Sequence, residues 1–157
     1  MPLTIHIHAD ARYAAHLSES LIRKTARAAL RHQNAVASGA LTIRITGDAL
    51  LRKLNREFMG KDYATDVLSF PVGETEAARR YFGDVVISIP RARAQAKAGG
   101  HTLTAELQLL IVHGVLHLLG HDHATRKEKA AMWAAQAEIL TVLKAPLTAP
   151  VLLNEAA

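Results

Sequence analysis

Three histidines in the segment HGVLHLLGHDH, residues 113–123, have the spacing of a metal site. His113 and His117 are four residues apart, so on a helix of about 3.6 residues per turn both rings project from one face. Gly120 ends such a helix and turns the chain, which brings His123 back toward the pair. Three neutral imidazoles suit a tetrahedral zinc ion whose fourth position stays open for water, as in catalytic sites. We therefore predict one Zn²⁺ per chain, bound by these three histidines.

The surroundings of the two helical histidines strengthen this prediction. Apolar residues fill most of the other positions in 109–119, and burying two imidazoles there is costly unless a partner satisfies them. A metal ion is such a partner. The chain has no cysteine, so the remaining ligand types are histidine and carboxylate. The absence of cysteine also fits a cytoplasmic location, which we expect for this protein.

Three neighbours of the histidines need separate interpretation. Asp122 either orients a ligand or accepts a proton, or it caps the next helix. His121 is interpreted as an exposed loop residue, because the open metal position then survives; the alternative is a fourth ligand. Gly114 occupies the position at which the zinc-protease pattern H-E-x-x-H has the glutamate that acts as general base. This chain therefore lacks the general base that a zinc protease of that type needs. We expect this glycine to leave space beside the metal for a bulky substrate.

The elements that must position this segment predict one mixed α+β domain, with a small four-stranded sheet and about five helices. Strands are predicted at residues 3–8, 41–46, 65–70 and 84–89, and a charged loop at 74–80. Helices are predicted at 12–32, at 48–58 with Asp48 as its cap, from Pro90 to Ala98, at 104–119, and from a capping box at Thr125 and Glu128 to about residue 143. The metal site then lies at the end of the long core helix 104–119. Residues 1–143 form the domain, and 144–157 a flexible tail.

Composition limits the function classes. Half of the residues are hydrophobic, yet there is no apolar run of about 18 residues, so we expect no membrane-spanning helix. The first ten residues lack the pattern of a signal peptide. The net charge of +5 favours an anionic partner, most commonly nucleic acid. The basic residues are spread along the chain, and those of the first helix (Arg23, Lys24, Arg27 and Arg31) are interpreted as a solvated helix surface.

Three segments resemble one known family. HGVLHLLGHDH resembles the signature H-G-x-L-H-L-x-G-x-D-H of the YbeY family of bacterial endoribonucleases and rRNA maturation factors. LNREFMGKDYATDVLSFP, residues 54–71, and FGDVVIS, residues 82–88, resemble two further segments of that family, in the same order. The resemblance spans most of residues 41–143, and the first helix and the tail carry little of it.

The resemblance implies a mixed α/β fold and zinc-dependent hydrolysis of single-stranded RNA. The role it implies is in maturation of small-subunit (16S) ribosomal RNA and in ribosome quality control. The expected partners are therefore single-stranded RNA, the small ribosomal subunit and its assembly factors, with neither a membrane nor DNA. By position, the zinc ligands are again His113, His117 and His123. The residues that match the second segment, expected beside the metal cleft, are Asn55, Lys61, Asp62, Thr65, Asp66, Ser69 and Phe70.

One departure from the family pattern concerns catalysis. Met59 stands where the family usually has an arginine, which is thought to contact RNA phosphate or stabilise charge in the transition state. Arg56 and Lys61, together with Asp122, are therefore the candidate catalytic residues besides the metal ligands. Alternatively, Met59 packs against the core near Phe58. Two other functions stay open: a ribosome-assembly binding factor with structural zinc and little catalysis, and a zinc peptidase.

Overall fold

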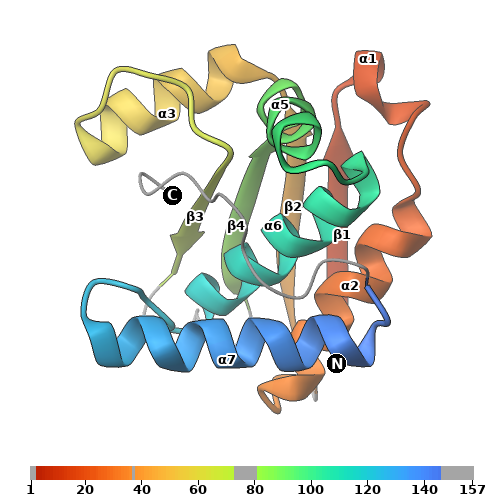
Figure 1. Ribbon diagram of the computed structural model, residues 1–157, viewed down its shortest axis with the longest axis vertical. Coiled ribbons are helices and arrows are strands. Elements are labelled where there is room, and N and C mark those ends of the chain that lie inside the picture. The colour runs from red at the N-terminus through yellow and green to blue at the C-terminus, as the bar shows by residue number, and fades with distance from the viewer. Residues whose placement is uncertain (1–2, 37, 73–80, 146–157) are drawn as a thin grey trace.

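A four-stranded sheet and six helices make up the part of the chain that the computed structural model describes, residues 3–36, 38–72 and 81–145 (Figure 1). The strand order is β1-β2-β4-β3. Strands β1 (Leu3–Ala9), β2 (Gly39–Thr46) and β4 (Tyr81–Ser88) are parallel. Strand β3 (Val67–Pro71) pairs antiparallel with β4 and forms one edge. In these residues no helix combines the length and the apolar character needed to cross a membrane.

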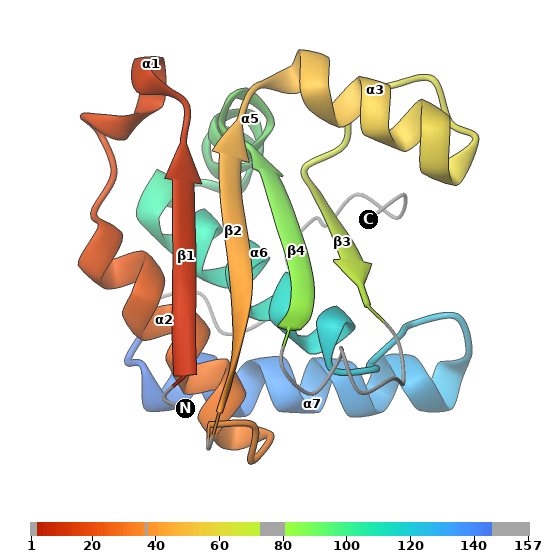
Figure 2. The same ribbon diagram turned by 180° about the vertical axis from the view of Figure 1, so that it is seen from behind.

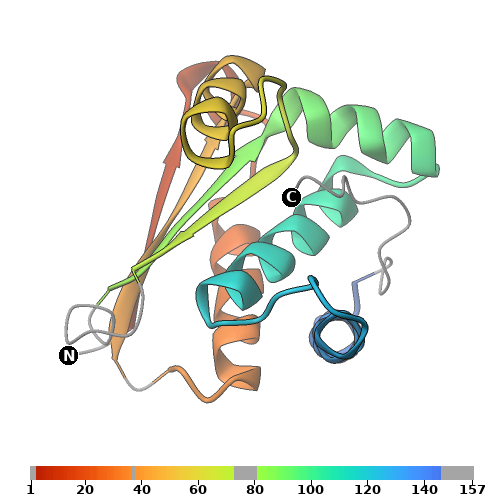
Figure 3. The same ribbon diagram turned by 90° about the vertical axis from the view of Figure 1, so that its left-hand side faces the viewer.

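The helices cover the two faces of the sheet unequally (Figures 1 and 3). Five of them contribute buried residues to the main core on one face, α1 through Tyr13 alone, and α3 packs on the other face. Their bounds are α1 Ala11–Ala14, α2 Glu19–His32, α3 Asp48–Met59, α5 Ile89–Gly99, α6 Leu103–Leu118 and α7 Arg126–Val142.

Helix α6 lies at the centre of the main core. Nearly all its residues are buried, and Leu110, Val112, Val115 and Leu116 are inaccessible to solvent. A helix that is apolar on all sides is stable only when other elements surround it. Here the sheet lies on one side, and α2, α5 and α7 surround the rest (Figures 1 and 2).

Helix α3 packs on the opposite face of the sheet. Leu51 of α3 forms a small cluster with Leu68 of β3 and Val86 of β4. The neighbouring strand residues Val67 and Val85 belong to the main core instead. Successive residues of a strand point to opposite faces, so β3 and β4 contribute to both cores.

Several predicted elements differ from the structure. Three of the strands, and the helices predicted at 104–119 and from Thr125 to about 143, are confirmed within one or two residues, whereas β4 begins three residues before the strand predicted at 84–89. The single helix at 12–32 is wrong: α1 ends at Ala14, and a new helix begins at Glu19, because the Ser18 side chain accepts a hydrogen bond from the Leu21 backbone N–H at 3.2 Å. This break gives six helices in the described residues where about five were expected.

The helix cap predicted at Asp48 is also wrong. Gly47 holds the capping position, and Asp48 is the first helical residue. Its carboxylate instead accepts a hydrogen bond from the Ser88 hydroxyl at 2.6 Å, which ties α3 to the end of β4. The predicted loop at 74–80 and nearly all of the predicted flexible tail lie outside the described residues, so the domain boundary at residue 143 stays a prediction.

Gly114 allows α6 to approach the sheet closely. A Cβ atom at this position would lie 2.5 Å from Cγ1 of Val85 and 3.3 Å from Oγ of Ser69. The Ser69 hydroxyl donates a hydrogen bond to the Gly114 carbonyl oxygen at 3.0 Å. The expectation that this glycine leaves space for a substrate is therefore wrong, because Val85 of strand β4 fills the space beside it.

We predict that Gly114→Ala destabilises the fold. Alanine favours a helix interior over glycine by about 1 kcal/mol, but overpacking a filled core costs about 1–3 kcal/mol. The contact is with the stiff, buried Val85, so we expect a net loss in the free energy of unfolding, measured in urea. The double variant Gly114→Ala/Val85→Ala is the control, because it removes the clashing methyl groups. A double variant as unstable as the sum of the two single variants would contradict this packing role.

Candidate metal site

The turn after α6 brings His123 to the helical histidines. Gly120 has a φ of +99°, a conformation that glycine adopts easily. The Gly120 N–H bonds to the His117 carbonyl at 3.1 Å, and the His121 N–H bonds to the Leu116 carbonyl at 3.0 Å. These two bonds form a Schellman motif, which reverses the chain at the helix end. The role predicted for Gly120 is therefore confirmed.

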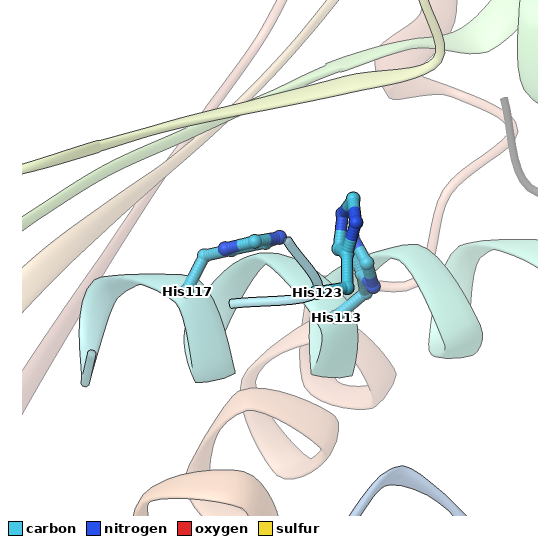
Figure 4. A group of neighbouring side chains, drawn as sticks. All are labelled: His113, His117 and His123. Carbon is cyan, nitrogen blue, oxygen red and sulfur yellow. The ribbon is translucent and has the colours of Figure 1, made fainter. Parts of the chain in front are cut away.

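The three predicted histidines lie together on one side of the end of α6 (Figure 4). One ligand nitrogen from each can be chosen so that all three lie within 4.8 Å of one another. The ring centroids of His113 and His117 are 4.7 Å apart, and that of His123 is 5.5 Å and 5.2 Å from them. In the described residues this is the one cluster of at least three such groups with metal-site geometry.

Helix α7 fixes the orientation of His113. The Nδ1–H of this buried ring donates a hydrogen bond to Oε1 of Gln136 at 2.7 Å, and Gln136 is also fully buried. Since Nδ1 carries the proton, Nε2 presents its lone pair to a metal ion. Trp133, one turn earlier on α7, packs its ring edge-on against His113 and His123, with centroids 5.9 Å and 5.7 Å away.

The protonation and burial of His117 fit a metal ligand. Its Nε2 is buried and has no hydrogen-bond partner among the residues that the structure describes. An unsatisfied buried nitrogen is costly, and a metal ion would satisfy it. Burial, with a smaller contribution from His123, lowers the pKa of His117 below its usual value. The ring is therefore neutral at pH 7, as metal binding requires.

Asp122 does not cap the next helix, and His121 is less exposed than expected. The Asp122 carboxylate is exposed and accepts a hydrogen bond from the His123 backbone N–H at 2.7 Å. It does not cap the next helix, because Thr125 and Glu128 form that capping box. His121 is half-buried rather than exposed, and its Nε2 lies 2.9 Å from Oε1 of Gln33 on α2.

Arg56 and Lys61 do not join the histidine cluster. Arg56 lies in the last turn of α3, Lys61 follows that helix, and both side chains are exposed. Asp62 pairs with Arg52 through two hydrogen bonds of 2.9 Å and 3.2 Å, and only loosely with Arg56, at 3.9 Å. The hydrogen bonds from Arg52 lower the pKa of the exposed Asp62 carboxyl.

Other residues of the second family-like segment support the fold around the site. Asn55 is buried and donates to the Tyr63 carbonyl oxygen at 2.9 Å, which fixes the turn after α3. Asp66 is buried too, and although Gln95 and the Val67 N–H donate to it, burial raises the pKa of its carboxyl. Ser69 contacts the metal-site helix directly, through Gly114.

Gln136 and Trp133 are the site residues that sequence reasoning missed. They lie in the last helix, beyond the segment with the histidines, and no spacing rule connects them to it. One signal was available: Gln136 shares a helix face with apolar residues such as Met132, Ile139 and Leu140. A glutamine on such a face needs a buried partner.

We predict that Gln136→Leu lowers metal affinity about 10- to 100-fold, because the liganding ring loses the acceptor that fixes it. Affinity for Zn²⁺ is measured by competition with a coloured chelator, and His117→Ala serves as the reference that should retain almost no metal. Gln108→Leu is the matched control, since Gln108 is a buried amide of α6 outside the cluster. Equal affinity in Gln136→Leu and the parent, with both folded by circular dichroism, would refute the role of this hydrogen bond.

Comparisons with known proteins point to one family. A family model described as "Endoribonuclease YbeY" matches residues 5–144. A relative of that name from Solibacter usitatus is 55% identical over 106 residues, which cover 67% of this chain and 69% of the relative. Another, from Halalkalibacterium halodurans, is 42% identical over 135 residues, or 78% and 84% of the two chains.

A solved structure supports the fold separately. The solution structure of a structural-genomics target from Thermotoga maritima matches with a TM-score of 0.58, covering 89% of this chain and 91% of that one. Its sequence identity is 20%, so it bears on the fold alone. The match of the family model to most of the chain and the identity to curated relatives confirm the resemblance seen in the three motifs: the chain belongs to the YbeY endoribonuclease family.

Proposed function

We propose that this protein is a zinc-dependent endoribonuclease that cleaves single-stranded RNA in the cytoplasm. Its proposed role is in maturation of small-subunit (16S) ribosomal RNA and in ribosome quality control, with the small subunit and its assembly factors as partners. The observation that carries the proposal is the cluster of three imidazoles at the end of a buried helix, in a chain of this family.

The donor set supports zinc as the resident ion. His113, His117 and His123 would hold it, and three nitrogen ligands leave one position of a tetrahedral zinc site for another group. Such an ion supplies positive charge for a phosphoryl oxygen and lowers the pKa of a water molecule to about 7. The neutral state of His117 and the fixed ring of His113 prepare the chain for this ion.

A route for RNA past the site runs over the edge strand β3. On one side of β3, Ser69 contacts α6 at Gly114, next to His113. On the other side, Phe70 packs edge-on against Phe58 near the end of α3, with ring centroids 5.3 Å apart. The end of α3 therefore lies across this strand from the histidines, on the β3 side of the molecule (Figure 1).

The exposed cations at the end of α3 are proposed to contact RNA phosphates. Arg56 is available because Asp62 is bound mainly to Arg52. Lys61 is a point charge without the planar geometry of a guanidinium. Asp122, exposed beside the cluster, is proposed to hold His123 in place and to accept a proton during cleavage.

Incubation with a labelled single-stranded RNA and, separately, with casein tests the proposed activity. We expect RNA cleavage by the metal-loaded protein, loss of cleavage after chelation, recovery with Zn²⁺, and no cleavage by His117→Ala. Ribosome binding without RNA cleavage would replace this proposal with the binding-factor alternative. Cleavage of casein would replace it with the peptidase alternative.

A second prediction concerns Met59, which is 45% exposed, while the adjacent Phe58 is 63% exposed. The alternative that Met59 packs into the core is therefore wrong, and Met59→Arg should fold normally. A preorganised charge can raise a rate by about a hundredfold; an introduced arginine is less well placed, so we expect roughly tenfold faster cleavage with unchanged metal content.

Single-turnover cleavage of a labelled RNA measures this change. Arg56→Ala is the companion variant, because Arg56 can already fill the role of the missing arginine. A large loss in Arg56→Ala with no gain in Met59→Arg would assign the role to Arg56. Equal rates in all three proteins would rule out a cation at this helix end as a contributor to cleavage.

A further inference from the structure

A basic groove lies between α2 and the end of α7, away from the histidine cluster. Its volume is about 380 Å³. Four cations of α2 line it, Arg23, Lys24, Arg27 and Arg31, together with Val142 and Leu143 at the end of α7. Figures 1 and 2 show that α7 runs from the loop after α6 to the side of α2. Helix α7 contacts the metal site near its middle, through Trp133 and Gln136, and the groove at its end, through Val142.

The charges in the groove are not balanced by neighbours. Arg23, Arg27 and Arg31 follow one another at intervals of four residues, which places like charges side by side on one helix face. In the part of the chain that is described, none of the four cations forms an ion pair with a carboxylate; Arg23 alone makes a hydrogen bond, to the Ile5 carbonyl oxygen at 3.4 Å. Repulsion between like charges at this spacing destabilises a helix. An anion bound in the groove would reduce the repulsion and so stabilise α2.

We propose that this groove is a second RNA-binding surface, which holds the phosphate backbone of a segment flanking the cleaved one. The inference rests on the proposed function, since it extends the same RNA along the protein. From Trp133 at the metal site to Val142 at the groove, α7 rises about 14 Å. That distance corresponds to at least about four stacked nucleotides. The groove therefore contacts RNA beyond the site of cleavage and favours longer substrates.

RNA fits this surface better than an anionic membrane does. The apolar face of α2, with Ile22, Ala26, Ala29 and Leu30, is buried in the core and cannot enter a lipid layer. An interfacial helix needs such a face exposed. The surface is also a groove rather than a flat face, and Arg27 and Arg31 are exposed along it. A groove lined by cations matches the shape and charge of a single RNA strand.

Binding of a fluorescein-labelled 20-nucleotide single-stranded RNA tests the proposal. Affinity is measured by fluorescence anisotropy at several salt concentrations, with the metal-loaded full-length protein and a 2′-O-methylated RNA that resists cleavage. We expect Arg27→Ala/Arg31→Ala to weaken binding about tenfold at low salt, and to reduce the slope of log affinity against log salt by about 1.4, the value for two phosphate contacts on a single strand.

The matched control is Arg93→Ala/Lys97→Ala, which removes two exposed cations with the same spacing from α5. Unchanged binding in this control supports the groove. An equal loss in both double variants, or no loss in either, overturns the proposal. Thermal unfolding should show no loss of stability in Arg27→Ala/Arg31→Ala, because two like charges are removed.

Two further outcomes separate this proposal from its alternatives. If Arg27→Ala/Arg31→Ala leaves RNA binding intact but abolishes cosedimentation with phosphatidylserine vesicles, the groove is a membrane site and the RNA proposal is wrong. If the parent protein does not cleave RNA, the proposed function fails, whereas the binding measurement still reports on the groove.

Discussion

The burial of an imidazole in the most apolar helix of the molecule is the constraint on which the site depends. His113 is 1% exposed in the middle of the core. A polar ring in this place is stable only when its nitrogens are satisfied. Gln136 satisfies Nδ1, and the second nitrogen is directed to where His117 and His123 gather. The requirement to bury a polar group thus also determines where the three candidate metal ligands meet.

The close contact between α6 and the sheet makes this arrangement rigid. With no side chain at Gly114, the helix backbone lies directly on Val85, and Ser69 bonds to its carbonyl oxygen. The first two candidate ligands, His113 and His117, therefore lie on an element that cannot rotate without disrupting the core. The third ligand lies in a loop, where the Schellman motif at Gly120 and the bond from the His123 N–H to Asp122 limit its freedom. A rigid pair and a restrained third ligand form a site that needs little rearrangement to bind an ion.

The sequence predicts the features that depend on local periodicity. The spacing of His113 and His117 and the helix stop at Gly120 follow from helix geometry, and both are correct. The roles of Gly114 and Gln136 depend on what packs against them from elsewhere in the chain. The local pattern shows at most that Gln136 needs a buried partner, and it does not show that the partner is His113. The break before α2 is a different case, because Ser18 caps the helix through a hydrogen bond from Leu21 only three residues along the chain. This local signal was present, but the apolar pattern continues through the break and favoured one long helix.

All the residues of the candidate site come from one continuous part of the chain. They lie on α6, on α7 and in the loop between these helices: the three histidines, Trp133 and Gln136. A bound ion would therefore cross-link residues of a single helical hairpin. Helix α7 is held to α6 partly through the very rings that would bind the ion. An ion bound by these rings would therefore also stabilise the docking of α7 on α6, because binding to the folded state alone shifts the equilibrium toward it.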